Sequence, residues 1–315
     1  MRMVALAGGV GASKLLLGLY HTISPADLTV VVNTGDDIEL HGLEISPDLD
    51  IVTYTLAGIV NPDTGWGVRG DTFRVLEGLQ QFGHEAWFNL GDADLATHIH
   101  RTALLRSGWT LSQVTDAVRR ALKVEARILP MSDQPVRTKI VTSEGILDFQ
   151  EYLVKRRTEP RVKEIRFEGA SNATPSPGVL EALAEAEIIV ICPSNPLISI
   201  GPILAVPGVR KALRNHASKV IAVSPIVGGR SLKGPSDKML SESGLEASAA
   251  AVARLYRDVA TTYVIDQRDS ADRPAIEELG MKVVEGSTIM KTLADKKRLA
   301  QLVVSAAASP VGATS

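Results

Sequence analysis

Two pairs of aspartates stand close together near the N-terminus. Asp36 and Asp37 end the apolar run VVNTGDD, and Asp48 and Asp50 follow in SPDLD. Carboxylates that converge repel one another unless a cation lies between them, and their hard oxygens suit a Mg²⁺ ion that bridges phosphates. Ser46, Asp48 and Asp50 could instead cap a helix that begins at this point. The residue types therefore indicate a metal or ligand site, with helix capping as the alternative.

A glycine-rich turn precedes these acids. The segment GGVGASK places Gly8, Gly9 and Gly11 directly after the first apolar run, with Lys14 close behind them. Glycines let a backbone approach a ligand closely, and the first amides of a following helix favour a phosphate. The spacing is neither GxGxxG nor GxxxxGK[ST]. A phosphate-binding loop is one interpretation, and a turn used only for tight packing is the other.

The segment ICPSNP also ends an apolar run in polar residues. Ser194 and Asn195 lie between two prolines there. Such a fixed polar pair can form hydrogen bonds with a base, a ribose or a phosphate. An Asx turn without a ligand explains the same pattern.

A later segment, SPIVGGRSLKGPSDK, combines glycines with basic residues. Gly228 and Gly229 permit close approach of the backbone, and Arg230 follows them. Arg230, Lys233 and Lys238 could meet phosphate charge. For the lysines a solvated face is the alternative.

Acids and histidines alternate in LGDADLATHIHR. This segment contains Asp92, Asp94, His98 and His100. Asp94 and His98 are four positions apart on a predicted helix, so they are expected to share a face. Such a pair is more often structural than part of a metal site.

These groups need elements that bring them together. Short apolar runs, rich in β-branched residues and without alternation, predict strands that are covered on both faces; they are MVALAGG, LTVVVNTGDD, EIIVICPSNP, KVIAVSPIVGG and TYVIDQRD. Helical patterns lie between them, at 12–20, 177–186, 207–215 and 246–258. This alternation predicts an α/β fold with a Rossmann-like, mostly parallel sheet and helices on both faces. Ligands collect beyond the carboxyl ends of such strands, where most of these motifs fall.

The pattern also predicts a division of the chain. Residues 1–70 and 175–310 form the Rossmann-like nucleotide-binding core, and 71–174 form a smaller α+β insert or cap, mostly helical and then built of antiparallel strands. Residues 305–315 are small or polar enough to form a flexible tail.

Composition limits the classes of function. The chain has 315 residues, a net charge of -2 and one cysteine, Cys192. A single cysteine allows no internal disulfide and no cysteine-ligated zinc site. Lys+Arg 34 nearly balances Asp+Glu 36, so no basic excess indicates a nucleic-acid or membrane partner. Without an apparent signal peptide or membrane span, the sequence predicts a cytoplasmic protein.

Several long motifs, in order and spacing, resemble one family. They are GGVGASKLLLGL, VVNTGDDIELHGLEISPDLDIVTYTLAG, GWGVRGDTF, LGDADLATHIHR, ILPMSDQPVRTKI, DFQEYLVKRR, PSNPLISIGPILAVPG and SPIVGGRSLKGPSDK. Over residues 3–304 the chain resembles the 2-phospho-L-lactate transferases of coenzyme F-420 biosynthesis. The resemblance implies transfer from guanosine-diphospho-lactate, or its enolpyruvyl analogue, to the terminal ribitol hydroxyl of the deazaflavin Fo, with release of GMP. It also implies Mg²⁺ and a homodimer.

The same resemblance implies roles for the acidic residues. Asp36, Asp37, Asp48 and Asp50 fall on the family's acidic metal and acceptor site, and Asp50 is also expected near Fo. A carboxylate such as Asp50 or Asp37 would orient the attacking hydroxyl or accept its proton. Asn89 occupies a position where archaeal members can carry a basic residue that contacts Fo.

Further contacts follow from the two substrates. Ser194 and Asn195 would bind the nucleotide, and the glycines and Arg230 its phosphates. If Asn89 makes no contact with Fo, Arg69 or Arg101 would replace it. Trp66 or Trp87 would stack on the flat deazaflavin, with a place in the core as the alternative.

Two other classes of protein fit parts of the sequence. A nicotinamide-dependent oxidoreductase would share the sheet, but GGVGASK departs from its fingerprint. A non-catalytic nucleotide-binding or sugar-nucleotide-binding regulator would share the glycine loop and the NTGDD motif. The blocks from SPDLD to GWG and LGDADLATH favour the transferase. Which three-carbon acid the donor carries stays open, because one methyl or methylene group is distinguished by pocket shape.

Overall fold

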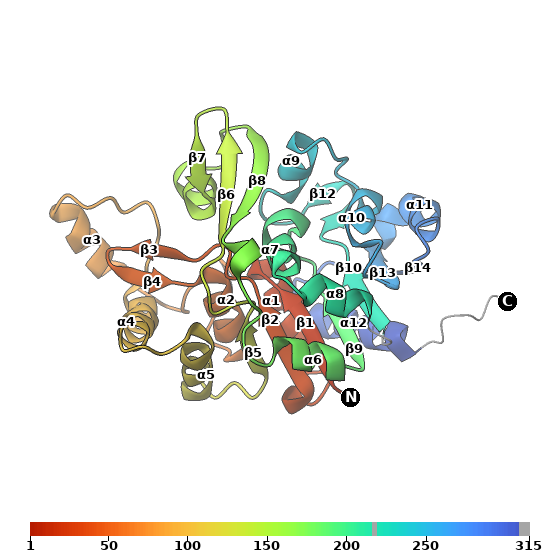
Figure 1. Ribbon diagram of the computed structural model, residues 1–315, viewed down its shortest axis with the longest axis horizontal. Coiled ribbons are helices and arrows are strands. Elements are labelled where there is room, and N and C mark those ends of the chain that lie inside the picture. Colours follow the sequence, from red (N-terminus) through yellow and green to blue (C-terminus); the bar gives the residue numbers. More distant parts are fainter. Residues whose placement is uncertain (216–218, 309–315) are drawn as a thin grey trace.

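A seven-stranded sheet forms the centre of the molecule in the computed structural model, which describes residues 1–215 and 219–308 (Figure 1). The strands follow the spatial order β14-β13-β10-β9-β1-β2-β5, and every neighbouring pair is parallel. Their bounds are β1 Met3–Ala7, β2 Leu28–Val32, β5 Arg127–Pro130, β9 Ile188–Ile191, β10 Lys219–Val223, β13 Thr262–Asp266 and β14 Lys282–Gly286. The predicted Rossmann-like α/β fold is confirmed.

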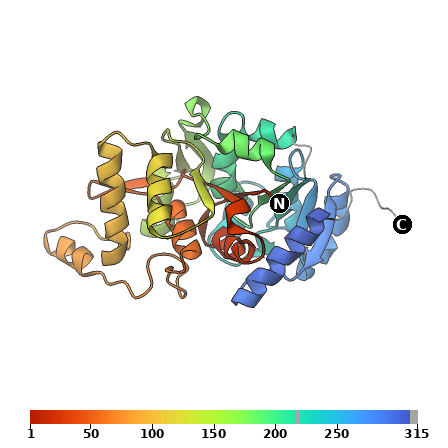
Figure 2. The same cartoon turned by 90° about the horizontal axis from the view of Figure 1, so that it is seen from below.

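Helices cover both faces of this sheet (Figure 2). Along β1 the side chains alternate: Val4 and Leu6 pack into the core on one face, and Met3, Ala5 and Ala7 into the core on the other. One face carries α1 (Gly9–Tyr20), α2 (Pro47–Leu56) and α12 (Leu293–Ala308). The opposite face carries α6 (Val179–Glu185), α7 (Gly201–Ala205), α8 (Val209–Arg214), α10 (Ala249–Tyr256) and α11 (Arg273–Glu277). Two-sided burial explains why the strands read as continuous apolar runs.

A short hairpin returns the chain between the two aspartate pairs. β3 (Ile38–Leu40) pairs antiparallel with β4 (Leu43–Ile45), and Ile38 lies opposite Ile45. His41 and Gly42 at the turn have φ values of 51 and 71 degrees, as a tight two-residue hairpin turn requires. The hairpin therefore brings the end of β2 next to the start of α2.

The predicted insert at 71–174 is not one continuous unit. Within it, β5 pairs with β2 as an edge strand of the central sheet. The helices α3 (Arg74–Gln81), α4 (Asp92–Arg106) and α5 (Leu111–Ala121) belong to the connection from β2 to β5. The strand was missed because RILP has only two apolar residues between an arginine and a proline.

The antiparallel part of the prediction is confirmed. After β5, the strands β6 (Arg137–Thr142), β7 (Ile146–Asp148) and β8 (Val162–Glu168) form a separate sheet of order β7-β6-β8. This small sheet stands at the top of Figure 1. We call residues 137–168 the cap. The cap contains a π-helical turn, η2 (Glu151–Lys155), between β7 and β8.

The C-terminal helix extends further than expected. α12 includes residues 305–308, and Ala306 and Ala307 are buried in the core. The predicted flexible tail is therefore wrong for 305–308, and the rest of that prediction lies outside the described residues. Within those residues, no helix combines the length and apolar character needed to cross a membrane.

Candidate active site

A cavity of about 760 Å³ opens at the carboxyl edge of the central sheet. The ends of five strands contribute to its wall. These contributions are Gly8 after β1, Asp36 after β2, Ser194 after β9, Ser224 after β10 and Thr288 after β14. Parallel strands place their carboxyl ends at one edge, which is why motifs far apart in the sequence meet here.

The glycine loop forms the floor where β1 passes into α1. A Cβ atom on Gly8 would lie 2.7 Å from the Oδ2 atom of Asp48, and Gly9 has a φ of +72 degrees. A Cβ atom on Gly11 would collide with the carbonyl oxygen of Pro193. The loop therefore serves close packing, and at Gly9 it requires a left-handed backbone that other residues adopt at a cost.

The hydroxyl of Ser194 is bound to this loop. It donates to the carbonyl oxygen of Gly8 at 2.8 Å and accepts from the Gly8 amide at 3.3 Å. Asn195 also lines the cavity, but its side-chain oxygen accepts from the amide of Leu197 at 2.9 Å. The Asx-turn alternative therefore describes Asn195 correctly, and its amide NH₂ group donates to the sulfur atom of Met239 at 3.6 Å.

Three lysines line the cavity together with the loop. Lys14 lies on α1, and Lys233 and Lys291 come from later loops. Partial burial, followed by the charges of Lys233 and Lys296, lowers the pKa of Lys14. Lys233 donates to the carbonyl oxygen of Thr64 at 2.7 Å. Clustered cations of this kind favour a ligand that carries several negative charges.

Asp36 and Asp48 form an uncompensated acidic pair. Both are buried in the cavity wall, 5% and 4% exposed. Asn33 donates to the Oδ2 atom of Asp48 at 2.9 Å, but within residues 1–215 and 219–308 the Oδ1 atom of Asp36 has no hydrogen-bond partner. Burial raises the pKa of Asp48 to about 6. Burial and then the charge of Asp48 raise the pKa of Asp36 well above its usual range.

Asp50 and Asp37 differ from this pair. Asp50 lines the cavity and forms a bidentate ion pair with Arg101. Asp37 does not line the cavity; it accepts a hydrogen bond of 2.9 Å from the hydroxyl of Ser46. Burial raises the pKa of Asp37 to about 7, while the charge of Arg137 opposes that rise. The geometry therefore gives Asp37 no direct contact with a ligand in the cavity.

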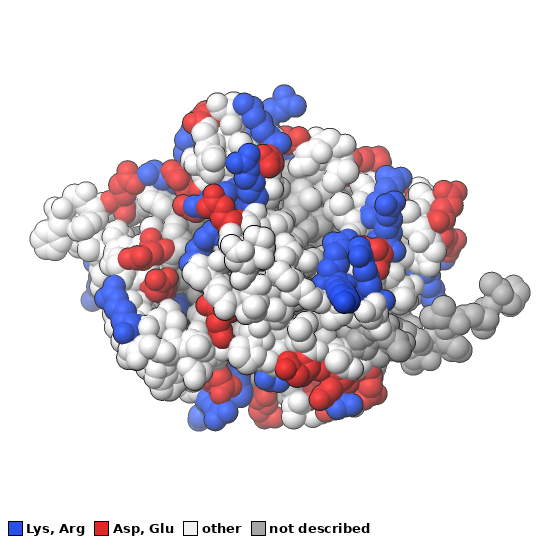
Figure 3. Space-filling view, viewed as in Figure 1, with Lys and Arg blue, Asp and Glu red and all other residues white. Residues whose placement is uncertain are grey.

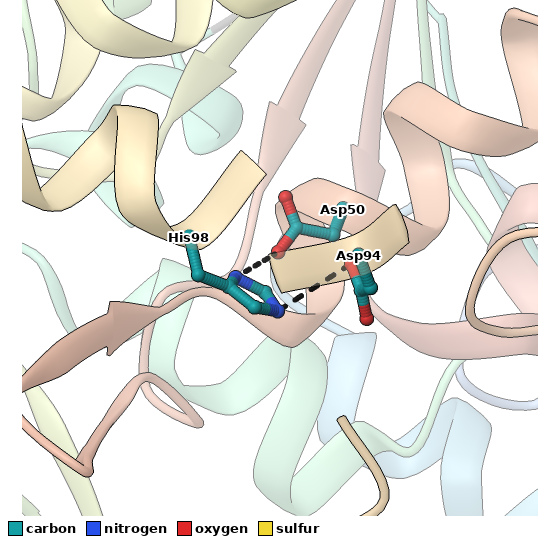
Figure 4. A group of neighbouring side chains, drawn as sticks. All are labelled: Asp50, Asp94 and His98. Carbon is teal, nitrogen blue, oxygen red and sulfur yellow. Dashed lines mark ion pairs between the residues drawn. The ribbon is translucent and has the colours of Figure 1, made fainter. Parts of the chain in front are cut away.

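Asp50, Asp94 and His98 form a buried cluster (Figure 4). Their ligand atoms all lie within 4.8 Å of one another. His98 Nε2 is 3.4 Å from Asp94 Oδ1, and His98 Nδ1 is 3.7 Å from Asp50 Oδ2. Asp94 and His98 share a face of α4, as their spacing predicts. Tyr54 donates to Asp94 Oδ1 at 2.7 Å.

This cluster already contains a cation. Arg101 Nη1 lies 3.2 Å from His98 Nδ1 and also donates to Asp50. A guanidinium can only donate, so Nδ1 of His98 is the acceptor in this contact. Nε2 of His98, 3.4 Å from Asp94 Oδ1, has no hydrogen-bond partner among the described residues. The positive charge of Arg101 therefore takes the place that a metal ion would occupy beside Asp50.

The remaining wall is largely apolar. Trp66 and Phe88 line it, together with the exposed side chain of Asn89. Trp87 lies outside the lining; its ring packs edge-on against Phe88 at 5.7 Å, near Lys155. The other apolar lining residues include Ile45, Tyr54, Phe149, Leu153 and Val154.

The structure does not bring Gly228, Gly229 and Arg230 into the cavity lining. The amides of Gly228 and Gly229 donate to the carboxylate of Asp269 at 3.0 and 3.2 Å, so an internal acid occupies the place expected for a phosphate. Lys238 likewise lies outside and donates to the carbonyl oxygen of Thr158.

Three further candidates also lie outside the lining. Asp92 accepts from the hydroxyl of Thr72 at 2.6 Å and from the amide of Val75 at 3.0 Å. His100 is exposed on α4, and Arg69 donates to the carbonyl oxygen of Gly58 at 3.3 Å. Asp92 and Arg69 therefore serve local structure rather than the cavity.

Sequence reasoning missed several residues of the wall. Tyr54, Gln150, Ser236 and Lys291 all line the cavity and were not singled out. Of these residues, only Tyr54 is close in sequence to the aspartates, within the motif VVNTGDDIELHGLEISPDLDIVTYTLAG. It follows Asp50 by four positions, so on a helix the two residues share a face. The others depend on contacts between distant parts of the chain.

Lysines, a glycine loop and buried carboxylates around one cavity define a Rossmann-like α/β protein suited to a phosphorylated ligand. Residues 3–307 match the family model described as 2-phospho-L-lactate transferase CofD, and the chain belongs to this family of transferases. The resemblance inferred from the motifs is confirmed. This membership favours the transferase over the oxidoreductase and the regulator.

Relatives with two different names are similar to the chain. A 2-phospho-L-lactate transferase from Methanosarcina mazei is 42% identical over 304 residues, covering 96% of this chain and all of the relative. A phosphoenolpyruvate transferase from Streptomyces griseus is 46% identical over 288 residues, covering 90% of this chain and 91% of the relative.

A solved structure supports the fold. The crystal structure of a member of the UPF0052 family from Bacillus halodurans has a TM-score of 0.66 and 15% sequence identity, and it covers 96% of this chain and 98% of that one. At this identity the likeness concerns the fold alone.

Proposed function

We propose that this transferase moves a phospholactyl or phosphoenolpyruvyl group from a guanosine-diphospho donor to the ribitol hydroxyl of the deazaflavin Fo. GMP is the second product, and the step belongs to coenzyme F-420 biosynthesis. One observation carries the proposal: a single cavity combines a glycine loop and lysines with buried carboxylates and an aromatic wall. Family membership and the names of the relatives agree with it.

Magnesium is the proposed metal, and the residues fit it. The Oδ1 atom of Asp36 is buried without a partner in the part of the chain described, beside the carboxylate of Asp48. Hard oxygens that lack a cation are the donors that Mg²⁺ prefers. Asp36 and Asp48 would hold the ion, whereas Asp50 already has the guanidinium of Arg101 as its cation. Bound there, Mg²⁺ would supply positive charge to the phosphates of the donor.

The basic side chains would bind the diphosphate. Lys14 and Lys233 have flexible stems and line the same cavity as the glycine loop. Breaking a diphosphate bond requires neutralisation of charge and alignment of the attacking alcohol more than covalent help from the protein. The lysines would therefore stabilise charge as it develops on the leaving GMP.

Asp50 would position the acceptor hydroxyl. Burial raises the pKa of this carboxyl, and the guanidinium of Arg101 opposes that rise. The ion pair thereby favours an ionised carboxylate on the cavity wall, which can accept a hydrogen bond from the hydroxyl or take its proton. Trp66 and Phe88 would contact the flat ring of Fo, and Asn89 would offer an amide to it.

Product analysis tests this function. The protein is incubated with Mg²⁺, Fo and either guanosine-diphospho-lactate or its enolpyruvyl analogue, and the products are identified by mass. The expected result is GMP together with the phosphodiester of Fo from at least one donor, and the preferred donor identifies the three-carbon acid. Absence of both products from both donors, with correctly folded protein, would contradict the proposal.

We also propose that the protein acts in the cytoplasm as a homodimer. Phe73, Val75 and Phe82 are exposed on and beside α3, and such apolar side chains favour a protein contact. The charged residues give less indication of a partner, because basic and acidic side chains are interspersed on the face shown in Figure 3. Light scattering of the purified chain would test the dimer, and Phe82→Ser should shift it toward monomer.

A further inference from the structure

The side-chain amide of Gln150 faces the cavity without a protein partner. Gln150 is only 7% exposed and lines the cavity. Over the described ranges, its side chain forms no hydrogen bond with the protein, and its polar atoms are not fully sealed from solvent. Buried amides are almost always hydrogen-bonded, since the loss of water is otherwise uncompensated. A ligand in the cavity is the group that could satisfy this amide.

The surroundings of Gln150 are apolar. Phe149 packs with Ile198 and Met239 in a small cluster where the cap meets the core. The π-helical turn η2 follows directly and places Leu153 and Val154 on the cavity. Turns of this kind are frequent at functional sites. A single amide set in an apolar wall suits a ligand that is flat and apolar on its faces and polar along one edge.

A second free hydroxyl lies on the same side. Ser236 is 3% exposed, lines the cavity and has no protein partner in the described chain. It begins α9 (Ser236–Glu242), and α9 also contributes Met239 to the cluster around Phe149. Two unpartnered polar groups around one cluster indicate a wall built to bind a polar edge.

The chemistry of the amide narrows the ligand. Along one edge, a glutamine amide presents one N–H donor beside its carbonyl acceptor, in one plane. Its complement is a ring edge that carries a carbonyl beside an N–H group. Both rings of the proposed reaction have such an edge: the deazaflavin of Fo and the guanine of the donor.

We propose that Gln150 forms paired hydrogen bonds with the carbonyl and N–H edge of a flat heterocycle bound in this cavity, and thereby selects the substrate. This inference rests on the proposed function, because that function supplies the two rings. Gln150 would be a specificity residue and would take no part in bond breaking.

Two ligand pairs test this role. Fo is compared with its analogue methylated at the ring N–H by fluorescence titration, and GMP is compared with N1-methyl-GMP by calorimetry. In the wild-type protein, the unmodified member of one pair should bind at least about tenfold more tightly, because methylation removes the donor that the site pairs with. In Gln150→Leu that preference should be lost, since the unmodified ligand binds about tenfold more weakly. The pair that responds identifies the ring.

Control variants separate this role from a general loss of structure. Gln150→Glu keeps the acceptor and removes the donor, so it should also weaken the responding ligand. Gln301→Leu changes an exposed glutamine on α12 and should leave both pairs unchanged. Because Gln150→Leu places an apolar group in an apolar wall, its circular dichroism and melting temperature should match the wild type.

The contrary outcomes are distinct. If wild-type protein binds Fo and GMP and Gln150→Leu keeps every preference of the wild type, the inference is wrong and the proposed function stands. If folded wild-type protein binds neither Fo nor GMP, the proposed function fails, and this inference fails with it.

Discussion

Arg101 donates to both carboxylate oxygens of Asp50, and the two side chains are buried together. Asp48 lies two residues earlier on the same helix, α2, and receives an amide hydrogen from Asn33 instead of a cation. One turn of helix therefore carries two aspartates with different electrostatic surroundings. This difference predicts opposite effects on stability when each aspartate is replaced by asparagine.

Replacing Asp50 by asparagine should damage both stability and activity. The change leaves the guanidinium of Arg101 buried without an anion, which costs about 3 to 5 kcal/mol in free energy of unfolding. Turnover should fall on the order of a hundredfold or more, because an aligning carboxylate is lost. Urea unfolding and a GMP-release assay measure the two effects.

Asp48→Asn makes the same change two residues earlier on α2 and is the variant to compare with Asp50→Asn. It removes a carboxylate that repels Asp36, so the metal-free protein should keep its stability or gain some. Activity should fall on the order of tenfold or more, because a proposed metal ligand is lost. Equal destabilisation by both substitutions would contradict the electrostatic difference.

Stability of the metal-free protein should decrease as pH rises. Burial holds the pKa of Asp37 at about 7 and that of Asp48 at about 6, above the ordinary value of 3.8. Between pH 4 and pH 7 (about the span of those two shifts), the folded protein therefore keeps protons that the unfolded chain has released. The free energy of unfolding should fall by about 1.4 kcal/mol per pH unit for each such proton.

Magnesium should reverse this trend. At pH 8, about two units above the pKa of Asp48, that carboxylate is ionised and Mg²⁺ would relieve its repulsion with Asp36, whereas at pH 5 protons compete with the metal. Calorimetry should show a larger rise in melting temperature with Mg²⁺ at pH 8 than at pH 5. The rise should be absent in Asp48→Asn. If the stability of the metal-free protein instead increases between pH 4 and pH 7 (about the span of the two shifts), burial does not raise the pKa values of Asp37 and Asp48.

Alanine substitutions in the glycine loop should have separable effects. At Gly9 the side chain has room but the φ of +72 degrees is unfavourable, which costs about 1 to 2 kcal/mol. At Gly11 the new Cβ atom meets the carbonyl of Pro193, so α1 and the β9 loop must move apart, at about 1 to 3 kcal/mol. Folded Gly9→Ala should bind guanine nucleotide more weakly. If calorimetry shows unchanged affinity, the loop is a packing turn only.

Asn89 provides a test of the acceptor side. It lines the cavity, whereas Arg69 and Arg101 are committed to Gly58 and Asp50, so neither arginine is available to replace it. A neutral hydrogen bond contributes roughly 0.5 to 1.5 kcal/mol, so Asn89→Ala should raise the KM for Fo by about tenfold at most. Asn89→Lys should be tolerated and should tighten binding. The opposite pattern in Fo titrations would remove Asn89 from the acceptor site.

The sequence by itself determined the central strands and the edge at which ligands gather. Buried parallel strands must be continuous apolar runs, and β1, β2, β9, β10 and β13 all read that way. Residues that follow the carboxyl end of a buried strand lie outside the core and can be polar. The aspartates and glycines found there therefore indicated the site. β5 and β14 were missed, because RILP and KVVEG mix charged or polar residues with very short apolar stretches.

Only the tertiary structure decided which polar groups already have partners. Arg101 reaches Asp50 across 51 positions of the chain, and Asp269 reaches the amide of Gly228 across 41. Gln150 lines the cavity, and folding brings it no hydrogen-bond partner among the described residues. Charge and hydrogen-bonding capacity are properties of a residue and can be read from its type. Whether a charge is paired, or a donor or acceptor is hydrogen-bonded, depends on which distant groups folding brings within about 3 Å. Local sequence does not contain that information.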